Sequence, residues 1–190
     1  MLDGVHVRRA TPDDALAIAT VHVRSWQAAY RGLLPQPYLD ALDPRVGRTE
    51  WDSVLAATSW PTTGTLVLAR RPHRGPGHHG GGGDTGDVVG FAALAPTRDE
   101  DDDPGLVGEL QTLYLDPPSW HRGGGTQLLG AVERQLTEAG FAMVAAWVLE
   151  TNTAARGFYE ARGWQADGTS RPHDWGTFVV TDVRYRKALG

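Results

Sequence analysis

The segment that decides the fold runs from Gly108 to Leu129 and reads G-E-L-Q-T-L-Y-L-D-P-P-S-W-H-R-G-G-G-T-Q-L-L. Gly108–Leu115 has the apolar character of a buried strand, and the glycines of residues 123–125 form a turn that opens onto a predicted helix, Thr126–Ala139. Such a turn leaves backbone N–H groups unpaired at the positive end of the helix dipole. Because phosphate groups bind there, the segment predicts a nucleotide-like ligand held by backbone amides.

A second informative segment, N-T-A-A-R-G-F-Y-E-A-R-G, runs from Asn152 to Gly163. It predicts a helix over Thr153–Arg162 that begins after Asn152, with Gly163 as the residue just beyond its end. A Phe-Tyr pair, Phe158 and Tyr159, lies in the second half of this helix. We expect the phenol of Tyr159 to lie near the reactive end of the bound ligand.

The rest of the chain alternates between strands and helices, which predicts one α/β domain over residues 1–190. The further predicted strands are Val5–Arg8, Thr65–Ala69, Val88–Ala95, Phe141–Glu150, Trp164–Ala166 and Phe178–Arg186. The further predicted helices run from the N-cap Thr11 to about Tyr30, over Tyr38–Leu42 and over Pro44–Ala57. A Gly/His-rich stretch, 70–87, predicts a flexible loop, and an acidic stretch, 97–105, predicts a solvated one.

Composition excludes several classes of protein. The 190 residues are 41% hydrophobic and 22% charged, as in an ordinary globular domain. There is no cysteine, which excludes disulfides, a thiolate nucleophile and a Cys-based zinc site. The net charge of −5 argues against a nucleic-acid partner and weakly fits a cationic acceptor. No apolar run predicts a membrane span or a secretory signal, so we expect a cytoplasmic protein.

Two familiar nucleotide-binding motifs do not fit the glycine turn. A dinucleotide fingerprint that starts at Gly123 and Gly125 requires a third glycine where Leu128 stands. A P-loop requires Gly-Lys-Ser/Thr, and Lys187 is the only lysine of the chain. A plain tight turn without a ligand is the remaining alternative.

Three motifs in order resemble the GNAT-type N-acetyltransferase superfamily. W-H-R-G-G-G at residues 120–125 is similar to the family's acetyl-CoA turn, [QR]-x-x-G-x-[GA], although Trp120 replaces the usual Gln or Arg. N-T-A-A-R-G-F-Y-E-A-R-G-W at residues 152–164 resembles N-x-x-A-x-x-F-Y-x-x-x-G-[FW], and G-E-L-Q-T-L-Y-L-D-P resembles the central strand. The opening V-R-R-A-T-P-D-D-A and the closing V-R-Y-R-K-A-L are also similar to the family's ends.

The resemblance implies a single GNAT-like domain with a mixed central sheet, helices on both faces, and two parallel strands splayed to form the cofactor cleft. It implies acetyl-CoA as cosubstrate and no metal. The residues expected to bind the cofactor are Leu113, Tyr114, Leu115, His121, Arg122, Gly123, Gly124, Gly125, Thr126, Asn152, Phe158 and Tyr159. Arg122 is expected to supply the charge that Trp120 lacks.

The implied reaction moves an acetyl group to a primary amine by direct attack in a ternary complex. Glu109 is the candidate base and Tyr159 the candidate acid, with a modest effect on rate. An ion pair or an exposed strand position is the alternative for Glu109, and a buried aromatic is the alternative for Tyr159. A noncatalytic acyl-CoA-binding module is the alternative function.

The acceptor is expected to be a small-molecule or peptide amine, and a homodimer is a possible assembly. Trp26, Tyr30 and Tyr38 are candidates for lining the acceptor pocket, with core packing as the alternative for each. We interpret the histidines of the 70–87 stretch (His73, His78 and His79) as loop residues rather than metal ligands. We interpret the acidic run Asp99–Asp103 as solvated.

Overall fold

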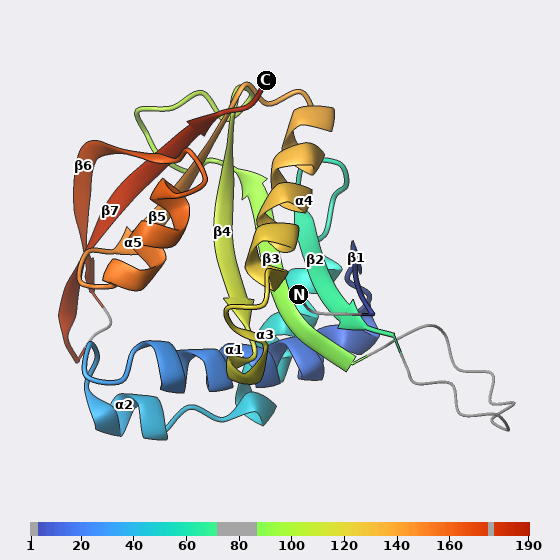
Figure 1. The fold of residues 1–190 in the computed structure, drawn as a ribbon, viewed down its shortest axis with the longest axis vertical. Coiled ribbons are helices and arrows are strands. Elements are labelled where there is room, and N and C mark those ends of the chain that lie inside the picture. Colours follow the sequence, from blue (N-terminus) through green and yellow to red (C-terminus); the bar gives the residue numbers. More distant parts are fainter. Residues whose placement is uncertain (1–3, 72–86, 175–176) are drawn as a thin grey trace, which may run out of the picture.

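The computed structural model describes residues 4–71, 87–174 and 177–190. Within these residues seven strands form one sheet in the order β1-β2-β3-β4-β5-β7-β6 (Figure 1). The strands are β1 (Val5–Arg9), β2 (Gly64–Arg70), β3 (Asp87–Pro96), β4 (Val107–Leu115), β5 (Met143–Leu149), β6 (Gln165–Asp174) and β7 (Val179–Ala188). Among the described strands only β4 and β5 pair in parallel, which confirms the predicted mixed sheet.

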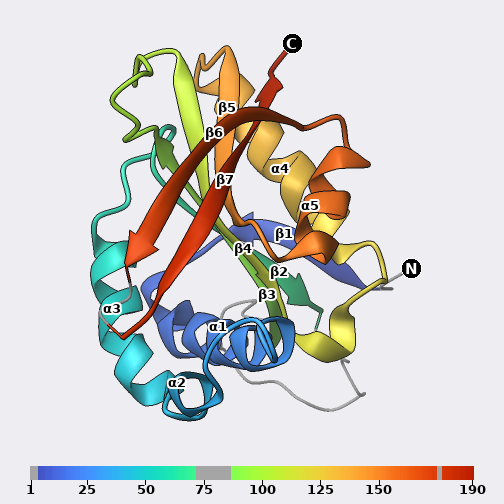
Figure 2. The same ribbon diagram turned by 90° about the vertical axis from the view of Figure 1, so that its left-hand side faces the viewer.

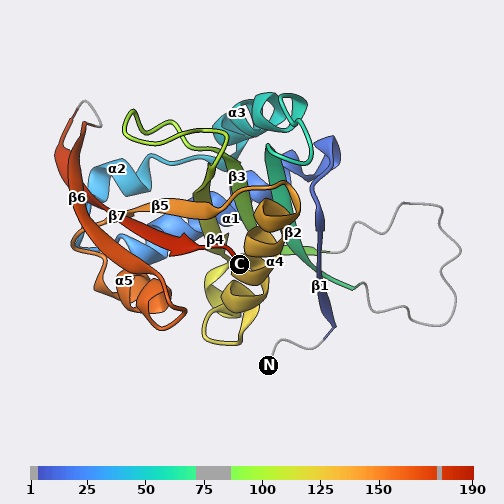
Figure 3. The same cartoon turned by 90° about the horizontal axis from the view of Figure 1, so that it is seen from above.

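Helices cover both faces of the sheet, as predicted (Figure 3). The helices are α1 (Ala15–Ala29), α2 (Gln36–Asp40), α3 (Pro44–Ala56), α4 (Gly124–Glu138) and α5 (Thr153–Glu160), with short 3-10 turns at η1 (Pro12–Asp14) and η2 (Pro117–Ser119). α4 and α5 lie on one face. α1 packs on the other face against β3 and β4, with α2 and α3 beside it (Figure 2).

The first helix begins later than the sequence predicts. Thr11 precedes η1, and α1 follows at Ala15. Asp14 completes a capping box with Thr11, because its carboxylate accepts a hydrogen bond from the Thr11 backbone N–H at 2.8 Å. Arg8 donates two further hydrogen bonds to the same carboxylate, at 2.7 and 2.8 Å. These contacts keep the pKa of Asp14 below its usual value, although burial opposes the shift.

The two parallel strands separate soon after they meet (Figure 1). Their described pairs are Val107 with Met143, Gly108 with Val144, and Glu109 with Ala145. Beyond Glu109 the described parts of β4 and β5 form no further pairs, so the facing backbone groups of both strands are left without a strand partner. The β3–β4 register shifts between Ala93 and Leu94, which pair with Thr112 and Leu110 and leave Gln111 as a bulge. The predicted splay is therefore confirmed.

Gly108 sits where helix α4 approaches β4 most closely. A Cβ atom at this position would lie 2.7 Å from Cδ2 of the fully buried Leu136. A glycine at the start of β4 therefore lets α4 pack directly on the sheet. The next residues of this face, Leu110 and Leu115, join the same core beneath α4.

Strand β6 is much longer than the predicted Trp164–Ala166. It runs over Gln165–Asp174, and most of its residues are exposed. Trp164 precedes the strand and is 1% exposed, with its indole N–H donating to Glu133 at 2.9 Å. The prediction was wrong because a polar segment has no apolar alternation, and pairing with β7 forms this strand instead.

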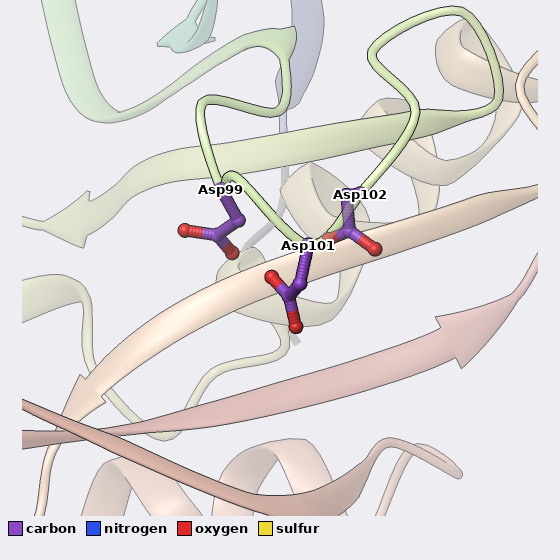
Figure 4. Close-up of side chains that lie close together, drawn as sticks. All are labelled: Asp99, Asp101 and Asp102. Atoms are coloured by element: carbon purple, nitrogen blue, oxygen red, sulfur yellow. The ribbon is translucent and has the colours of Figure 1, made fainter.

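The acidic run is also not simply solvated. Asp99, Asp101 and Asp102 extend from the loop between β3 and β4 and gather on one side of it (Figure 4). Arg184 of β7 is 4% exposed and donates to Asp101 at 2.7 Å through each of two nitrogens, and to Asp99 at 3.3 Å. Arg186 donates to Asp102 at 2.7 Å. The loop is therefore tied to β7 by ion pairs, which corrects the prediction.

The two arginines also share one carboxylate of β6. Both Nε atoms, of Arg184 and of Arg186, lie 2.7 Å from Oδ2 of Asp167. Arg184 further donates to the Thr169 hydroxyl at 2.9 Å. We call Asp99, Asp101, Asp102, Asp167, Arg184 and Arg186 the arginine–aspartate network.

A buried histidine supports the strand that borders the cleft. The imidazole of His22 on α1 stacks on the ring of Tyr114, with centroids 5.1 Å apart and planes 22° apart. Trp51 donates its indole N–H to His22 Nδ1 at 3.4 Å, which requires that nitrogen to be unprotonated. Burial lowers the pKa of His22 to about 4.

We expect this histidine to make the protein acid-sensitive. Because its pKa is about 4 when folded and about 6.5 when unfolded, the unfolded chain binds more protons between these values. The free energy of unfolding should fall by about 3 kcal/mol from this group as the pH drops from 7 to 4. Urea unfolding across that range measures it, and His22→Gln should show a shallower slope. Parallel slopes in the two proteins would contradict the assignment.

Most of the predicted Gly/His-rich loop, 72–86 with His73, His78 and His79, lies outside the described residues. Among the helices that the structure describes, none has the length and apolar character needed to span a bilayer.

Candidate active site

A cleft of about 630 Å³ opens where β4 and β5 separate. One side is formed by β4, the other by β5 and α5, and α1 and the glycine turn contribute to its ends. The residues that line it are Ser25, Ala28, Ala29, Tyr30, Leu110, Gln111, Thr112, Leu113, Tyr114, Leu115, Trp120, His121, Gly123, Gly125, Thr126, Trp147, Val148, Leu149, Asn152, Ala154, Ala155, Phe158, Tyr159 and Arg162. Ten of the twelve predicted cofactor residues are therefore brought together, and Arg122 and Gly124 are not among the lining residues.

The glycine turn presents unpaired amides to this cleft. α4 begins at Gly124, two residues before the predicted start, and Gly123 is its N-cap, with a φ of 85°. The first helical bond that closes on this cap is from the Gln127 N–H to the Gly123 carbonyl, at 3.1 Å. The amides of Gly124, Gly125 and Thr126 therefore have no acceptor within the helix, and glycine has no side chain to cap them.

A second residue of the turn, in addition to Gly123, has a left-handed backbone. His121 has a φ of 57°, which is uncommon for a residue with a side chain. Left-handed residues interspersed in a turn direct successive N–H groups to one side and form an anion-binding concavity. The turn thus combines a positive helix end with a concave row of donors.

Gly125 lies in close contact with α5. A Cβ atom here would be 3.2 Å from Cε2 and 3.3 Å from Cζ of Phe158. The missing side chain lets the ring of Phe158, which also lines the cleft, pack directly against the turn.

Trp120 has a structural contact where the family motif carries Gln or Arg. Its indole N–H donates to the Leu115 carbonyl at 2.7 Å, which joins the end of β4 to the turn. Arg122, the expected source of compensating charge, is exposed and does not line the cleft. Arg162 does line it, and the sequence analysis missed this residue. Its spacing of four residues from Phe158 on a helix was the available signal.

Tyr159 also lines the cleft. It is 8% exposed, and its ring packs edge-on against Phe158 with centroids 5.4 Å apart. Burial raises its pKa well above the usual value for a phenol, so the hydroxyl keeps its proton at neutral pH. It can therefore donate a hydrogen bond to a developing negative charge. Tyr159 is thus a buried aromatic, and its role as the acid stays a prediction.

Asn152 serves α5 as well as the cleft. Its side-chain oxygen accepts a hydrogen bond from the Ala155 N–H at 3.0 Å and caps the helix. Asn152 and Tyr30 both line the cleft, and the Asn152 amide limits the rise that burial causes in the pKa of the Tyr30 phenol.

Of the three predicted acceptor-pocket residues, only Tyr30 lines the cleft. Its hydroxyl lies 3.3 Å from that of Tyr114, and burial raises the pKa of both. Trp26 is 9% exposed and packs edge-on against Tyr30, so the core alternative holds for it. Tyr38 packs edge-on against Phe178, outside the cleft lining. The ring of Trp26 fills the core there because α1 covers the apolar face of β3 and β4.

Glu109 is buried close to the cleft but not on its surface. It is 5% exposed, and its Oε2 lies 3.7 Å from Nε of Arg98, so the ion-pair alternative is realised. It is also the last β4 residue that pairs with β5, and Gln111, two positions on, lines the cleft. Direct contact with an acceptor in the cleft is therefore not available to its carboxylate in this arrangement.

The profile of the acetyltransferase (GNAT) family matches residues 35–164, more than half of the chain. The chain belongs to this family. The uncharacterized N-acetyltransferase YuaI of Bacillus subtilis (strain 168) is 31% identical over 157 residues, which cover 83% of this chain and 78% of YuaI. This GNAT chain is accordingly an acetyl-CoA-dependent acetyltransferase.

Solved GNAT structures share the fold at lower identity. The PaiA N-acetyltransferase of Thermoplasma acidophilum, solved with coenzyme A, is similar with a TM-score of 0.67 and 18% identity, covering 97% of this chain and 98% of that one. YncA of Salmonella typhimurium, solved with acetyl-CoA, is similar with a TM-score of 0.66 and 16% identity, covering 98% and 94%. The GNAT fold is therefore preserved over almost the whole chain.

Proposed function

We propose that this GNAT chain acetylates the primary amine of a small molecule or peptide, and that acetyl-CoA lies in the cleft between β4 and β5. The observation that carries the proposal is the open junction itself, whose lining includes both the turn with the uncapped amides of α4 and the phenol of Tyr159. The solved relatives with coenzyme A and acetyl-CoA support the same cofactor.

The residues present fit a cofactor of this shape. The uncapped amides of Gly124, Gly125 and Thr126 suit a pyrophosphate. The edge of β4 at Leu113, which has no strand partner on the side of β5, suits the amide groups of the pantetheine arm, which would pair with it as a strand does. Bound acetyl-CoA supplies an acetyl group activated as a thioester.

Residues of this chain would assist the loss of a proton by the amine and the departure of the CoA thiolate. An alkyl amine with a pKa near 10.4 is almost fully protonated at pH 7, and its deprotonation costs roughly 4–5 kcal/mol. Glu109, at the point where the strands part, would take this proton through an intervening water rather than directly. Tyr159 would donate a hydrogen bond to the departing thiolate, which its raised pKa favours over complete proton transfer. The amine attacks directly, and no covalent enzyme intermediate is required.

Release of free CoA from acetyl-CoA across a panel of amines tests this proposal. The panel should contain amino acids, polyamines, aminoglycosides and lysine or N-terminal peptides. Amine-dependent turnover identifies the acceptor class. Binding of acetyl-CoA by calorimetry without turnover for any amine would contradict the proposed acceptor, and absence of binding would contradict the placement of the cofactor.

In the same assay we expect Tyr159→Phe to lower kcat about tenfold with an unchanged Kd for acetyl-CoA, because it removes only a donor to the leaving group. Glu109→Gln should lower the rate most at low pH, where the acceptor amine is most fully protonated. Tyr185→Phe is the control, since it removes a phenol hydroxyl outside the cleft lining. A Tyr159→Phe enzyme as fast as wild type would exclude the donor role.

A further inference from the structure

We infer that Arg162 binds the pyrophosphate of the cofactor and supplies the side-chain charge that Trp120 does not. The inference rests on the proposed placement of acetyl-CoA in the cleft. It is carried by the fixed position of the guanidinium group beside the N-terminus of α4.

Three hydrogen bonds and one ring hold the guanidinium in place. Nε and Nη2 donate to the Thr126 hydroxyl at 3.1 and 2.7 Å, and Nη1 donates to the Phe158 carbonyl at 2.7 Å. The group also lies 3.8 Å from the centroid of the Phe158 ring. Arg162 is partly buried and lines the cleft. A group held by this many contacts is preorganised for a ligand.

The charge of Arg162 is not neutralised. Its hydrogen-bond acceptors are a hydroxyl and a carbonyl, and no carboxylate within the described residues forms an ion pair with it. This contrasts with Arg184, which carboxylates surround. A guanidinium group has five N–H donors, so these three hydrogen bonds leave two donors available. An anion in the cleft would pair with a charge that otherwise has no partner there.

The contact with Thr126 selects the pyrophosphate over the cofactor's 3′-phosphate. Thr126 is the third residue of α4, and its own amide belongs to the unpaired row of the helix terminus. The guanidinium is thus tethered next to the donors that suit a pyrophosphate. The helix dipole and the Arg162 guanidinium therefore both favour a negative charge at the N-terminus of α4. Arg162 thereby supplies the side-chain charge that Trp120 does not.

Calorimetry without an amine acceptor tests the inference, with CoA, dephospho-CoA and pantetheine as ligands. Arg162→Met should weaken binding of CoA and of dephospho-CoA by about tenfold each, because both carry the pyrophosphate. It should leave the affinity for pantetheine, which has no phosphate, unchanged. Arg162→Lys should recover part of the loss, and the salt dependence of CoA binding should decrease in Arg162→Met.

Arg156→Met is the matched control, since Arg156 lies on α5, shortly before Arg162 in the chain, and does not line the cleft. Equal CoA affinity in wild type and Arg162→Met would overturn the inference. So would a loss confined to CoA, which would assign Arg162 to the 3′-phosphate, or an equal loss for pantetheine, which would indicate a purely structural link between α5 and α4. If wild type itself does not bind CoA, the placement of the cofactor fails and not the role of Arg162 alone.

Discussion

Replacing Arg184 by methionine is expected to lower the free energy of unfolding by about 3–5 kcal/mol, the cost of removing one partner from a buried ion pair. The side chain is 4% exposed and holds carboxylates from two separate parts of the chain, the loop with Asp99 and Asp101 and the strand with Asp167. Methionine has similar length but leaves these carboxylates close together without a counter-charge. Repulsion between them and the lost hydrogen bonds act in the same direction.

Chemical unfolding in urea measures the loss, and Arg45→Met is the control. Arg45 also pairs with an aspartate, Asp43, at 3.0 Å, but its side chain is 87% exposed. Such a surface pair contributes at most about 1 kcal/mol. Similar midpoints for the two variants would show that the network around Arg184 contributes no more than an ordinary surface pair.

The stabilisation that the arginine–aspartate network provides is lost in acid. Its arginine contacts lower the pKa of Asp101 to about 2, below the ordinary value of 3.8. Because the folded pKa is the lower one, the contribution of this carboxylate is complete above the unfolded pKa and is lost as the pH falls through about 2. The effect of Arg184→Met should therefore shrink as the pH falls from 3.8 to about 2.

Replacing Gly125 by valine is expected to weaken acetyl-CoA binding about 100-fold, or about 2.7 kcal/mol. A Cβ atom at this position already lies 3.2 Å from the Phe158 ring, and the two methyl groups of valine require still more room. They would displace the Phe158 ring from the turn and shift the amides that are proposed to bind a phosphate. Calorimetry with acetyl-CoA measures the change.

Gly130→Val is the matched control on the same helix. A Cβ atom at Gly130 meets only Nη1 of Arg134 within 4 Å, at an ordinary distance of 3.6 Å. This variant carries the same β-branched residue in α4 but should keep the wild-type affinity. Loss of affinity in both variants would attribute the effect to the helix rather than to the cleft.

The fold and one wall of the cleft were predictable from the sequence because they depend on local chemistry. The strand before the glycine turn, the turn and the Asn152 cap are contiguous motifs whose backbone geometry follows from their residues. β6 was not predictable in length, since Gln165–Asp174 is polar and pairing with β7 forms the strand. Long-range pairing of this kind leaves no periodic pattern in one segment.

The second wall depended on contacts that the sequence does not display. Trp26 on α1 and Tyr30 at the C-cap of α1 are equally suited to a pocket by residue type, but packing on β4 buries the first and leaves the second at the cleft. Trp147 and the small residues of α1 at positions 25, 28 and 29 also line the cleft and carried no motif. Arg162 was missed because its partner Thr126 lies on a different helix.

The gap between β4 and β5 would link the stability of the folded enzyme to the concentration of its cosubstrate. Among the described residues, Val107, Gly108 and Glu109 of β4 pair with β5 and join the two parts of the sheet there. The arginine–aspartate network adds ion pairs between the β3–β4 loop and β7. A pantetheine arm in the gap would act as a replacement strand between the two halves. By mass action, a ligand at 100 times its Kd raises the free energy of unfolding by about 2.7 kcal/mol. The lifetime of the folded enzyme would then follow the supply of its own acetyl donor.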